Sequence, residues 1–221
     1  MLPRFVRILH RARDPVAART FYAAVLGDLD IEITPLPEAA AARGAPAHWL
    51  GAIGVDDVSQ TVAQRVARGA TQLGRTVRDA RGTLAIVRDV GGAVVALTTP
   101  PPAPQPPAAE WSHLDARDAE TTFGVYTALF GWQSTERVDL GRAGTMTQFA
   151  WNAGGPSVGS YADIASRPGI HPGWIFHFRV GALDTALQAV RDHGGVVLAG
   201  PTTRSGVRVV VSRTEYAPTN L

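Results

Sequence analysis

The stretch WSHLDARDAETTFGVYTALFGW, Trp111 to Trp132, determines how the rest of the chain is interpreted. Its first residues are predicted to form a strand, and Asp118 then stands where a helix N-cap belongs. The apolar residues that follow recur at helical spacing, and Gly131 ends this pattern. The stretch therefore predicts a strand, a capped helix and the start of a second strand.

Weaker copies of this stretch recur, so the chain is predicted to be an internal repeat. An offset of 104 residues places Asp118 on Asp14, and an offset of 125 residues places Trp174 on Trp49. The offsets differ by 21 residues, about the length of two strands with their turns. We therefore predict two halves of two strand–helix–strands modules each, with a β-hairpin lost from the first module.

The remaining elements are predicted from helix-capping residues and apolar periodicity. Asp14 and the pair Asp56–Asp57 are predicted to cap helices, the second with Val58, Val62 and Val66 on its buried face. The predicted strands are Phe5–Ala12, Leu29–Thr34, Trp49–Val55, Thr71–Val77, Leu84–Val87, Ala93–Thr98, Trp132–Val138, Thr145–Trp151, Ser157–Tyr161, Trp174–Val180, Val196–Leu198 and Val207–Val211.

A proline-rich segment, PPPAPQPPAAE, separates the two halves. Proline at this density cannot pair in a sheet and favours an extended linker. We therefore expect a shortened domain at residues 1–99, a linker at Pro100–Glu110 and a second domain at residues 111–221.

Composition excludes several classes of protein. Cysteine is absent, which rules out disulfides, zinc ribbons and thiol nucleophiles. The formal charge is +2, and no basic cluster alternates with aromatic residues, so we expect no nucleic-acid partner. No apolar run is long enough to cross a membrane and no secretory signal is evident, so we expect a cytoplasmic protein.

Several segments carry a family resemblance: DPVAARTFYAAVLG, HWLGAIGVDDV, DAETTFGVYTALFGW, and GWIFHFRV with DHGGVVLAGP. In them the chain resembles the vicinal oxygen chelate superfamily, which includes glyoxalase I, bleomycin-resistance proteins and extradiol dioxygenases, and especially its tandem two-domain members. The resemblance covers nearly the whole chain except Leu29–Ala47, the linker and the C-terminal tail. It implies an α+β fold of paired βαβββ modules whose cupped mixed sheets hold a ligand or metal.

The resemblance also implies the positions of metal ligands. The first would fall at Arg7 and Trp111, the second at Leu50 and Ile175, and a carboxylate on the last strand of the first half at Ala96. None of these side chains ligates a divalent ion. We therefore expect no metal of the family type and no other cofactor.

Two histidines near these positions are candidate ligand-binding residues. His113 lies two residues beyond Trp111, and His177 two beyond Ile175, so each is predicted to share a face of its strand with that residue. They are either a polar pair in the cup of the second half, serving ligand binding, proton transfer or a displaced metal, or two unrelated histidines that bond to backbone or line a wet groove.

The aromatic residues of the second half complete the candidate site. They line a pocket for a flat ligand or, as such residues more often do, fill a small β core. The ligand-binding candidates are His113, His177, Trp111, Trp132, Trp174 and Tyr161.

Together these patterns predict a metal-free protein that binds a small molecule in the cup of the second half, an aromatic one if the tryptophans line a pocket. An open sheet edge in the shortened first half favours a homodimer. One alternative is a lyase or dioxygenase that uses a divalent metal ion at a displaced histidine-based site. The other is a degenerate scaffold that binds only a protein partner.

Overall fold

The computed structural model describes residues 2–27, 31–101, 109–141, 144–164, 170–197 and 208–210. Most of the predicted linker, the end of the predicted strand Val196–Leu198 and the C-terminal tail lie outside these residues. Within them, no helix combines the length and the apolar character needed to cross a bilayer.

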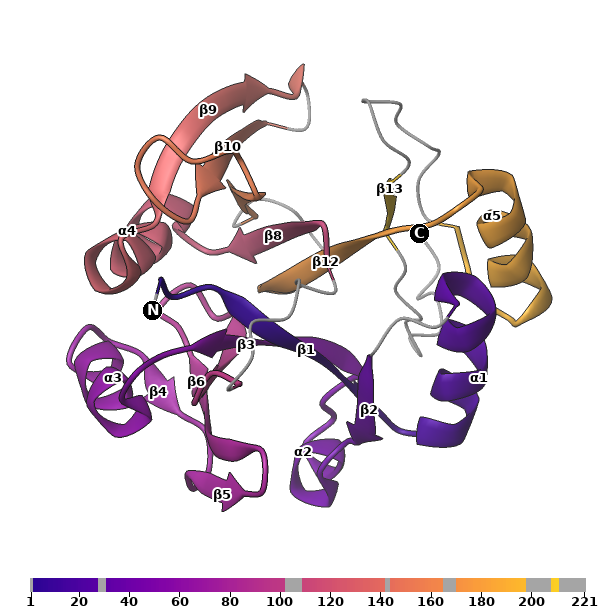
Figure 1. Ribbon diagram of the computed structural model, residues 1–221, viewed down its shortest axis with the longest axis horizontal. Coiled ribbons are helices and arrows are strands. Elements are labelled where there is room, and N and C mark those ends of the chain that lie inside the picture. Colours follow the sequence, from indigo (N-terminus) through magenta and orange to yellow (C-terminus); the bar gives the residue numbers. More distant parts are fainter. Residues whose placement is uncertain are drawn as a thin grey trace. The chain divides into compact units, whose positions relative to one another are not determined.

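The elements follow the sequence prediction closely in order and type (Figure 1). They are β1 (Phe5–Ala12), α1 (Pro15–Leu26), β2 (Glu32–Pro35), α2 (Glu38–Ala42), β3 (His48–Gly54), α3 (Val58–Val66), β4 (Thr71–Gln72), β5 (Val77–Asp79), β6 (Gly82–Arg88), β7 (Val94–Thr98), β8 (Trp111–Ala116), α4 (Ala119–Phe130), β9 (Gln133–Asp139), β10 (Thr145–Ala150), β11 (Gly159–Asp163), β12 (Gly173–Arg179), α5 (Leu183–Asp192) and β13 (Arg208–Val210).

The strands form two mixed sheets, one for each half of the sequence. The seven-stranded sheet has the order β2-β1-β3-β7-β6-β4, with β5 paired to β6. The six-stranded sheet has the order β13-β12-β8-β11-β10-β9. The predicted α+β class and the paired βαβββ modules are thus confirmed.

The shortened first module is also confirmed, and the structure shows which strands it lacks. In the second half, α4 is followed by β9, β10 and β11, and β11 pairs in parallel with β8. In the first half, the one described strand between α1 and β3 is β2, and it pairs in parallel with β1. Both β2 and β11 thus pair in parallel with the first strand of their module, so β2 corresponds to β11. The missing hairpin therefore corresponds to β9 and β10.

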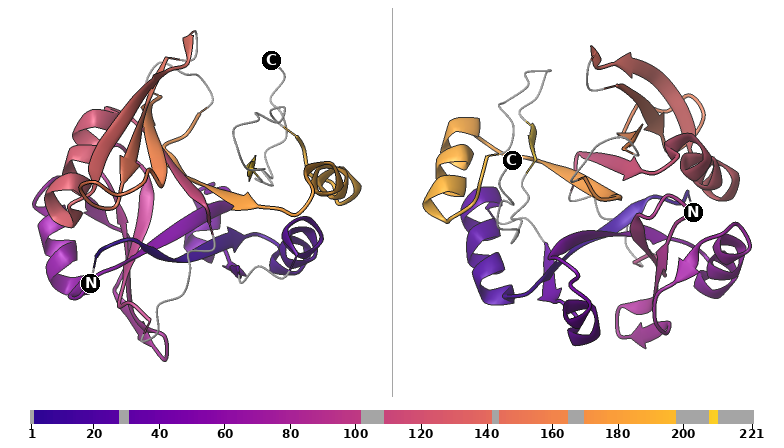
Figure 2. Two further views of the ribbon diagram at one scale, coloured as in Figure 1. Left: turned by 45° about the horizontal axis from the view of Figure 1, so that its top comes forward. Right: turned by 180° about the vertical axis from the view of Figure 1, so that it is seen from behind.

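The chain forms two compact units that each combine segments from both halves. Unit 1 contains residues 1–7, 51–107 and 111–175, and unit 2 contains residues 8–50, 108–110 and 176–221. In unit 1, α3 and α4 lie side by side, and in unit 2, α1 packs on α5 (Figure 2).

Local chemistry explains where the predicted elements begin and where they depart from expectation. Side chains of Asp14, Asp57 and Asp118 accept backbone N–H bonds at the starts of α1, α3 and α4. The prediction for α3 was wrong at its end, because Val66 is 46% exposed and Arg65 is buried instead. The predicted strand Thr71–Val77 was also wrong, since the chain turns at Gly74, where φ is 78°, and forms the separate strands β4 and β5.

Aromatic side chains fill the core of unit 1. The rings of Trp132 and Phe149 stack at 5.3 Å, and Phe5 lies 4.9 Å from Trp174. The indole N–H of Trp132 donates to the backbone oxygen of Pro3 at 2.7 Å. The N-terminal segment of the first half is therefore anchored among aromatic residues of the second half.

Candidate functional site

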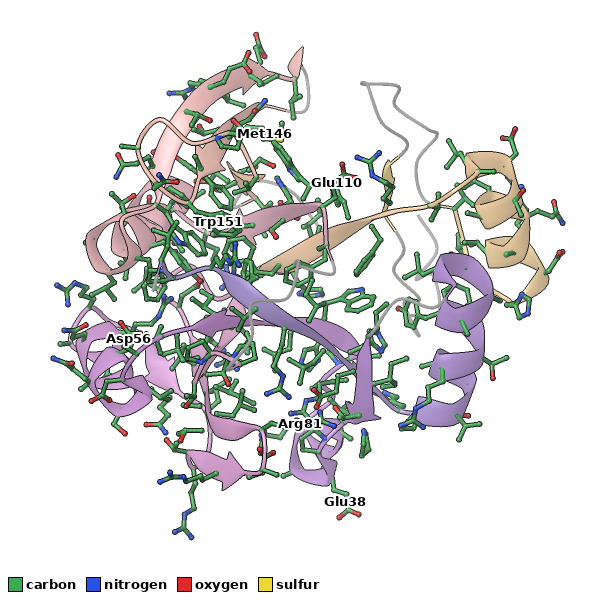
Figure 3. The ribbon with its side chains drawn as sticks, in the orientation of Figure 1. Glu38, Asp56, Arg81, Glu110, Met146 and Trp151 are labelled. Carbon is green, nitrogen blue, oxygen red and sulfur yellow. The ribbon has the colours of Figure 1, made fainter. Side chains whose placement is uncertain are left out.

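The strands β8, β11, β10 and β9 have one face against α4 and one face turned away from it, here called the open face. Tyr161 of β11 stacks on Phe123 of α4 at 4.3 Å, so Tyr161 marks the covered face. Its neighbour Ser160 and the paired residue His113 point to the opposite side, because successive side chains of a strand alternate. Figure 3 shows Met146 of β10 on that side as well.

A chain of hydrogen bonds crosses the open face. The Nε1–H of Trp111 donates to Oγ of Ser160 at 3.0 Å, and that oxygen lies 2.7 Å from Nδ1 of His113. The other ring nitrogen of His113, Nε2, lies 3.3 Å from Oδ1 of Asp115. Strand β8 supplies three of the four residues from alternate positions, and β11 supplies Ser160 directly opposite His113.

Exposure differs among the residues of this chain of hydrogen bonds. Ser160 is fully buried, whereas the side chains of His113 and Asp115 are 16% and 10% exposed. Burial, together with the N–H bond from Trp111, makes Ser160 unsuited to act as a nucleophile. The arrangement can instead hold the imidazole of His113 in one orientation and present the Asp115 carboxylate to a ligand.

Polar and apolar residues continue across the open face on the neighbouring strands. Gln148 pairs with Ser160 in the register of β10 and β11, and its amide donates to Glu136 of β9 at 3.3 Å. Met146 pairs with Ala162 in the adjacent row. Among the described residues of these four strands, the open face thus carries two carboxylates beside Trp111 and Met146.

The structure brings together only part of the predicted set. Trp111 and His113 meet on the open face as expected, whereas Trp132, Trp174 and Tyr161 lie on the α4 side among the core rings. His177 belongs to unit 2, where β12 pairs with β13 and the backbone oxygen of His177 accepts a bond from the Glu110 N–H.

Sequence reasoning missed Ser160, Asp115 and Gln148. A signal for Asp115 was present, because Trp111, His113 and Asp115 stand at alternate positions of one strand. Ser160 had no local signal, because it lies 47 residues from His113 and reaches it only through the parallel pairing of β8 and β11.

A second polar cluster lies inside unit 1, between α3, α4 and the turn from β6 to β7. The hydroxyl of Tyr126 donates to Oδ2 of Asp89 at 3.0 Å and accepts from Nε1 of Trp174 at 3.3 Å. The guanidinium of Arg65 lies 4.4 Å from the centre of the Tyr126 ring, and its nitrogens hydrogen-bond to none of the described residues. A cation over an aromatic ring in a dry site is stabilised by about 2 kcal/mol.

Burial controls the acid–base behaviour of this cluster. It raises the pKa of Asp89 above its ordinary value, although the hydrogen bond from Tyr126 and the nearby charge of Arg65 act in the opposite direction. Burial, followed by the charge of Asp89, also raises the pKa of Tyr126. The cluster is enclosed by the core rather than open to a ligand, so its role is structural.

Comparison with solved structures identifies the architecture. A mutant of 4-hydroxymandelate synthase from Streptomyces coelicolor matches with a TM-score of 0.56 and 17% identity, over 88% of this chain and 76% of the other. The 2,2',3-trihydroxybiphenyl 1,2-dioxygenase of Sphingomonas wittichii matches with 0.57 and 13%, over 93% and 84%. Homoprotocatechuate 2,3-dioxygenase from Brevibacterium fuscum, in complex with 3,4-dihydroxyphenylacetate, matches with 0.56 and 14%, over 86% and 68%.

The chain has the vicinal oxygen chelate fold. These identities are low, so the likeness establishes architecture alone. No protein-family model matches the chain, and no curated protein matches it by sequence.

The residues of this vicinal oxygen chelate fold do not fit a metal centre of the family type. At the positions implied by the resemblance, Leu50 and Ala96 are buried aliphatic side chains, and the indole N–H of Trp111 is bonded to Ser160. Both ring nitrogens of His113 are bonded within the protein. No group of three or more histidine, aspartate or glutamate side chains among the described residues could hold a metal ion.

Proposed function

We propose that the chain binds a small hydroxyl-bearing aromatic molecule on the open face of β8, β11, β10 and β9, without a metal ion. The observation that carries this proposal is the hydrogen-bond chain from Trp111 through Ser160 and His113 to Asp115. It links a fully buried serine to two polar groups whose side chains are 16% and 10% exposed, and a ligand site is typically mostly apolar with a few such polar groups.

The chemistry of the open face supports a ligand with an aromatic ring and hydrogen-bond donors. Trp111 and Met146 offer an indole ring and a polarisable thioether for contact with a flat apolar surface. Asp115 and Glu136 offer carboxylate oxygens, which accept hydrogen bonds from hydroxyl groups. One structural neighbour is named for 2,2',3-trihydroxybiphenyl, an uncharged hydroxylated aromatic compound, which agrees with this ligand class.

Binding of catechol, measured by isothermal titration calorimetry or ligand-observed NMR, tests the proposal. We expect a saturable interaction that weakens at least about tenfold in the His113→Ala variant, equivalent to about 1.4 kcal/mol. His193→Ala is a matched control, because this histidine is exposed at the end of α5 and its Nδ1 lies beside the backbone oxygen of Ala189.

Two outcomes would count against the proposal. The first is that catechol and related phenols do not bind wild type, or bind wild type and His113→Ala with equal affinity. The second is that protein purified without chelator holds a stoichiometric divalent ion, and that His113→Ala does not. This result would favour a displaced metal site over ligand binding without a metal.

A further inference from the structure

The open face contains a hydrogen-bond chain whose direction can be deduced. Building on the proposed function, we propose that Trp111, Ser160 and His113 are positioning residues that fix one tautomer of His113. In that tautomer Nε2 carries the proton and holds Asp115, so that the carboxylate of Asp115 receives hydrogen-bond donors of the ligand and disfavours anions.

The direction starts at Trp111, because an indole N–H is a donor and never an acceptor. Its bond of 3.0 Å therefore occupies one lone pair of the Ser160 oxygen. The Ser160 hydroxyl has a single proton, and His113 Nδ1 is the other group within bonding distance in the described residues, at 2.7 Å. Ser160 is fully buried, so water cannot take that proton instead.

The remaining proton of the neutral imidazole must then lie on Nε2. The Ser160 hydroxyl donates to Nδ1, so Nδ1 is an acceptor and Nε2–H points to Oδ1 of Asp115 at 3.3 Å. In the opposite direction Nδ1–H would donate to Ser160, leaving a buried hydroxyl proton without an acceptor. It would also place the lone pair of Nε2 against a carboxylate oxygen, which is repulsive.

This order of bonds assigns Asp115 as the group that contacts the ligand. Both nitrogens of His113 are engaged, and Oδ1 of Asp115 is held by Nε2–H, whereas Oδ2 bonds to none of the described residues. A carboxylate anchored on one oxygen presents the other in a fixed direction. It accepts bonds from hydroxyl groups or cations and repels carboxylates, and Glu136 on the same face adds to that repulsion.

The tautomer is tested without any ligand by 15N NMR of the His113 ring at a pH where the imidazole is neutral. We expect a protonated Nε2 and an Nδ1 resonance displaced by an accepted hydrogen bond. In Ser160→Ala that displacement should disappear while the spectrum retains the dispersion of a folded protein. A proton on Nδ1 of the wild type would overturn the assignment, whatever the protein binds.

The ligand class is tested with two probes of similar size, catechol and benzoate. We expect wild type to bind catechol at least about tenfold more tightly than benzoate, and Asp115→Asn to reduce that ratio about tenfold or more. Asp184→Asn, in the first turn of α5, is a matched control for the loss of one carboxylate and should keep the ratio.

The outcomes separate this inference from the proposed function. Equal or tighter binding of benzoate, or an unchanged ratio in Asp115→Asn, refutes Asp115 as the ligand-contacting group even if catechol binds. Failure of both probes to bind wild type refutes the proposed function and the ligand class together, while the NMR result still decides the hydrogen-bond chain.

Discussion

The hydroxyl of Tyr126 connects the buried polar cluster of unit 1 and is expected to stabilise the fold. Tyr126→Phe removes a hydroxyl that donates to Asp89 at 3.0 Å and accepts from the Trp174 N–H at 3.3 Å. A bond to a charged acceptor contributes about 1.5–3 kcal/mol, and a buried donor left without a partner costs about 1–3 kcal/mol. The aromatic ring remains, so no large cavity forms, and we expect a loss of about 3 kcal/mol.

That loss is a large share of the about 5–15 kcal/mol that stabilises a typical domain. Urea denaturation should show a lower midpoint with an unchanged slope, because the surface exposed on unfolding does not change. Tyr161→Phe is the matched control, since its hydroxyl bonds to Ser134 and Glu120 in part-buried positions and should contribute less. If Tyr126→Phe lay within about 0.5 kcal/mol of wild type, or cost no more than Tyr161→Phe, the reasoning about the cluster would be refuted.

Three further predictions concern the same unit. Phe5→Ala should cost about 3–5 kcal/mol by calorimetry or denaturation, because the ring is 2% exposed among core aromatic side chains; a cost below about 1 kcal/mol would contradict this. Gly91→Ala should destabilise by about 1–3 kcal/mol, since a Cβ there would lie 2.8 Å from that of Ala116 and 2.9 Å from the backbone oxygen of Arg117; an unchanged melting temperature would refute it. Because burial raises the pKa of Asp89 above 3.8, this group stabilises the fold most at low pH, and that contribution is lost as pH rises through its folded pKa. The stability of wild type relative to Asp89→Asn should therefore fall as pH rises from about 4 to 8, and a constant difference would exclude the effect.

The scaffold could be predicted from the sequence because its signals are local. Asp118 and Gly131 bound α4, and the apolar spacing between them marks its buried face. The missing hairpin followed from the difference between two repeat offsets, which needs no knowledge of contacts. These features depend on residues near one another in the chain or on identical spacings.

The site was less predictable, because it depends on register and on which face of a strand is covered. Ser160 reaches His113 only through the pairing of two strands 47 residues apart. Tyr161 is one residue away from Ser160, and that single step places its ring against Phe123 instead of on the open face. The buried position of Arg65 was missed for a related reason, because the helical face expected to end in Val66 is rotated by one residue.

The parallel pairing of β2 with β1 has a consequence for how this chain tolerates changes in length. The hairpin absent from the first module corresponds to the outermost strands of the other sheet, so its loss leaves every pairing further inside intact. The new rim, β2, has four residues and ends in Pro35, two features that discourage pairing with a foreign strand. Strands at the edge of such a sheet can be removed or added without changing the inner pairings. An engineered hairpin is therefore best added next to β2.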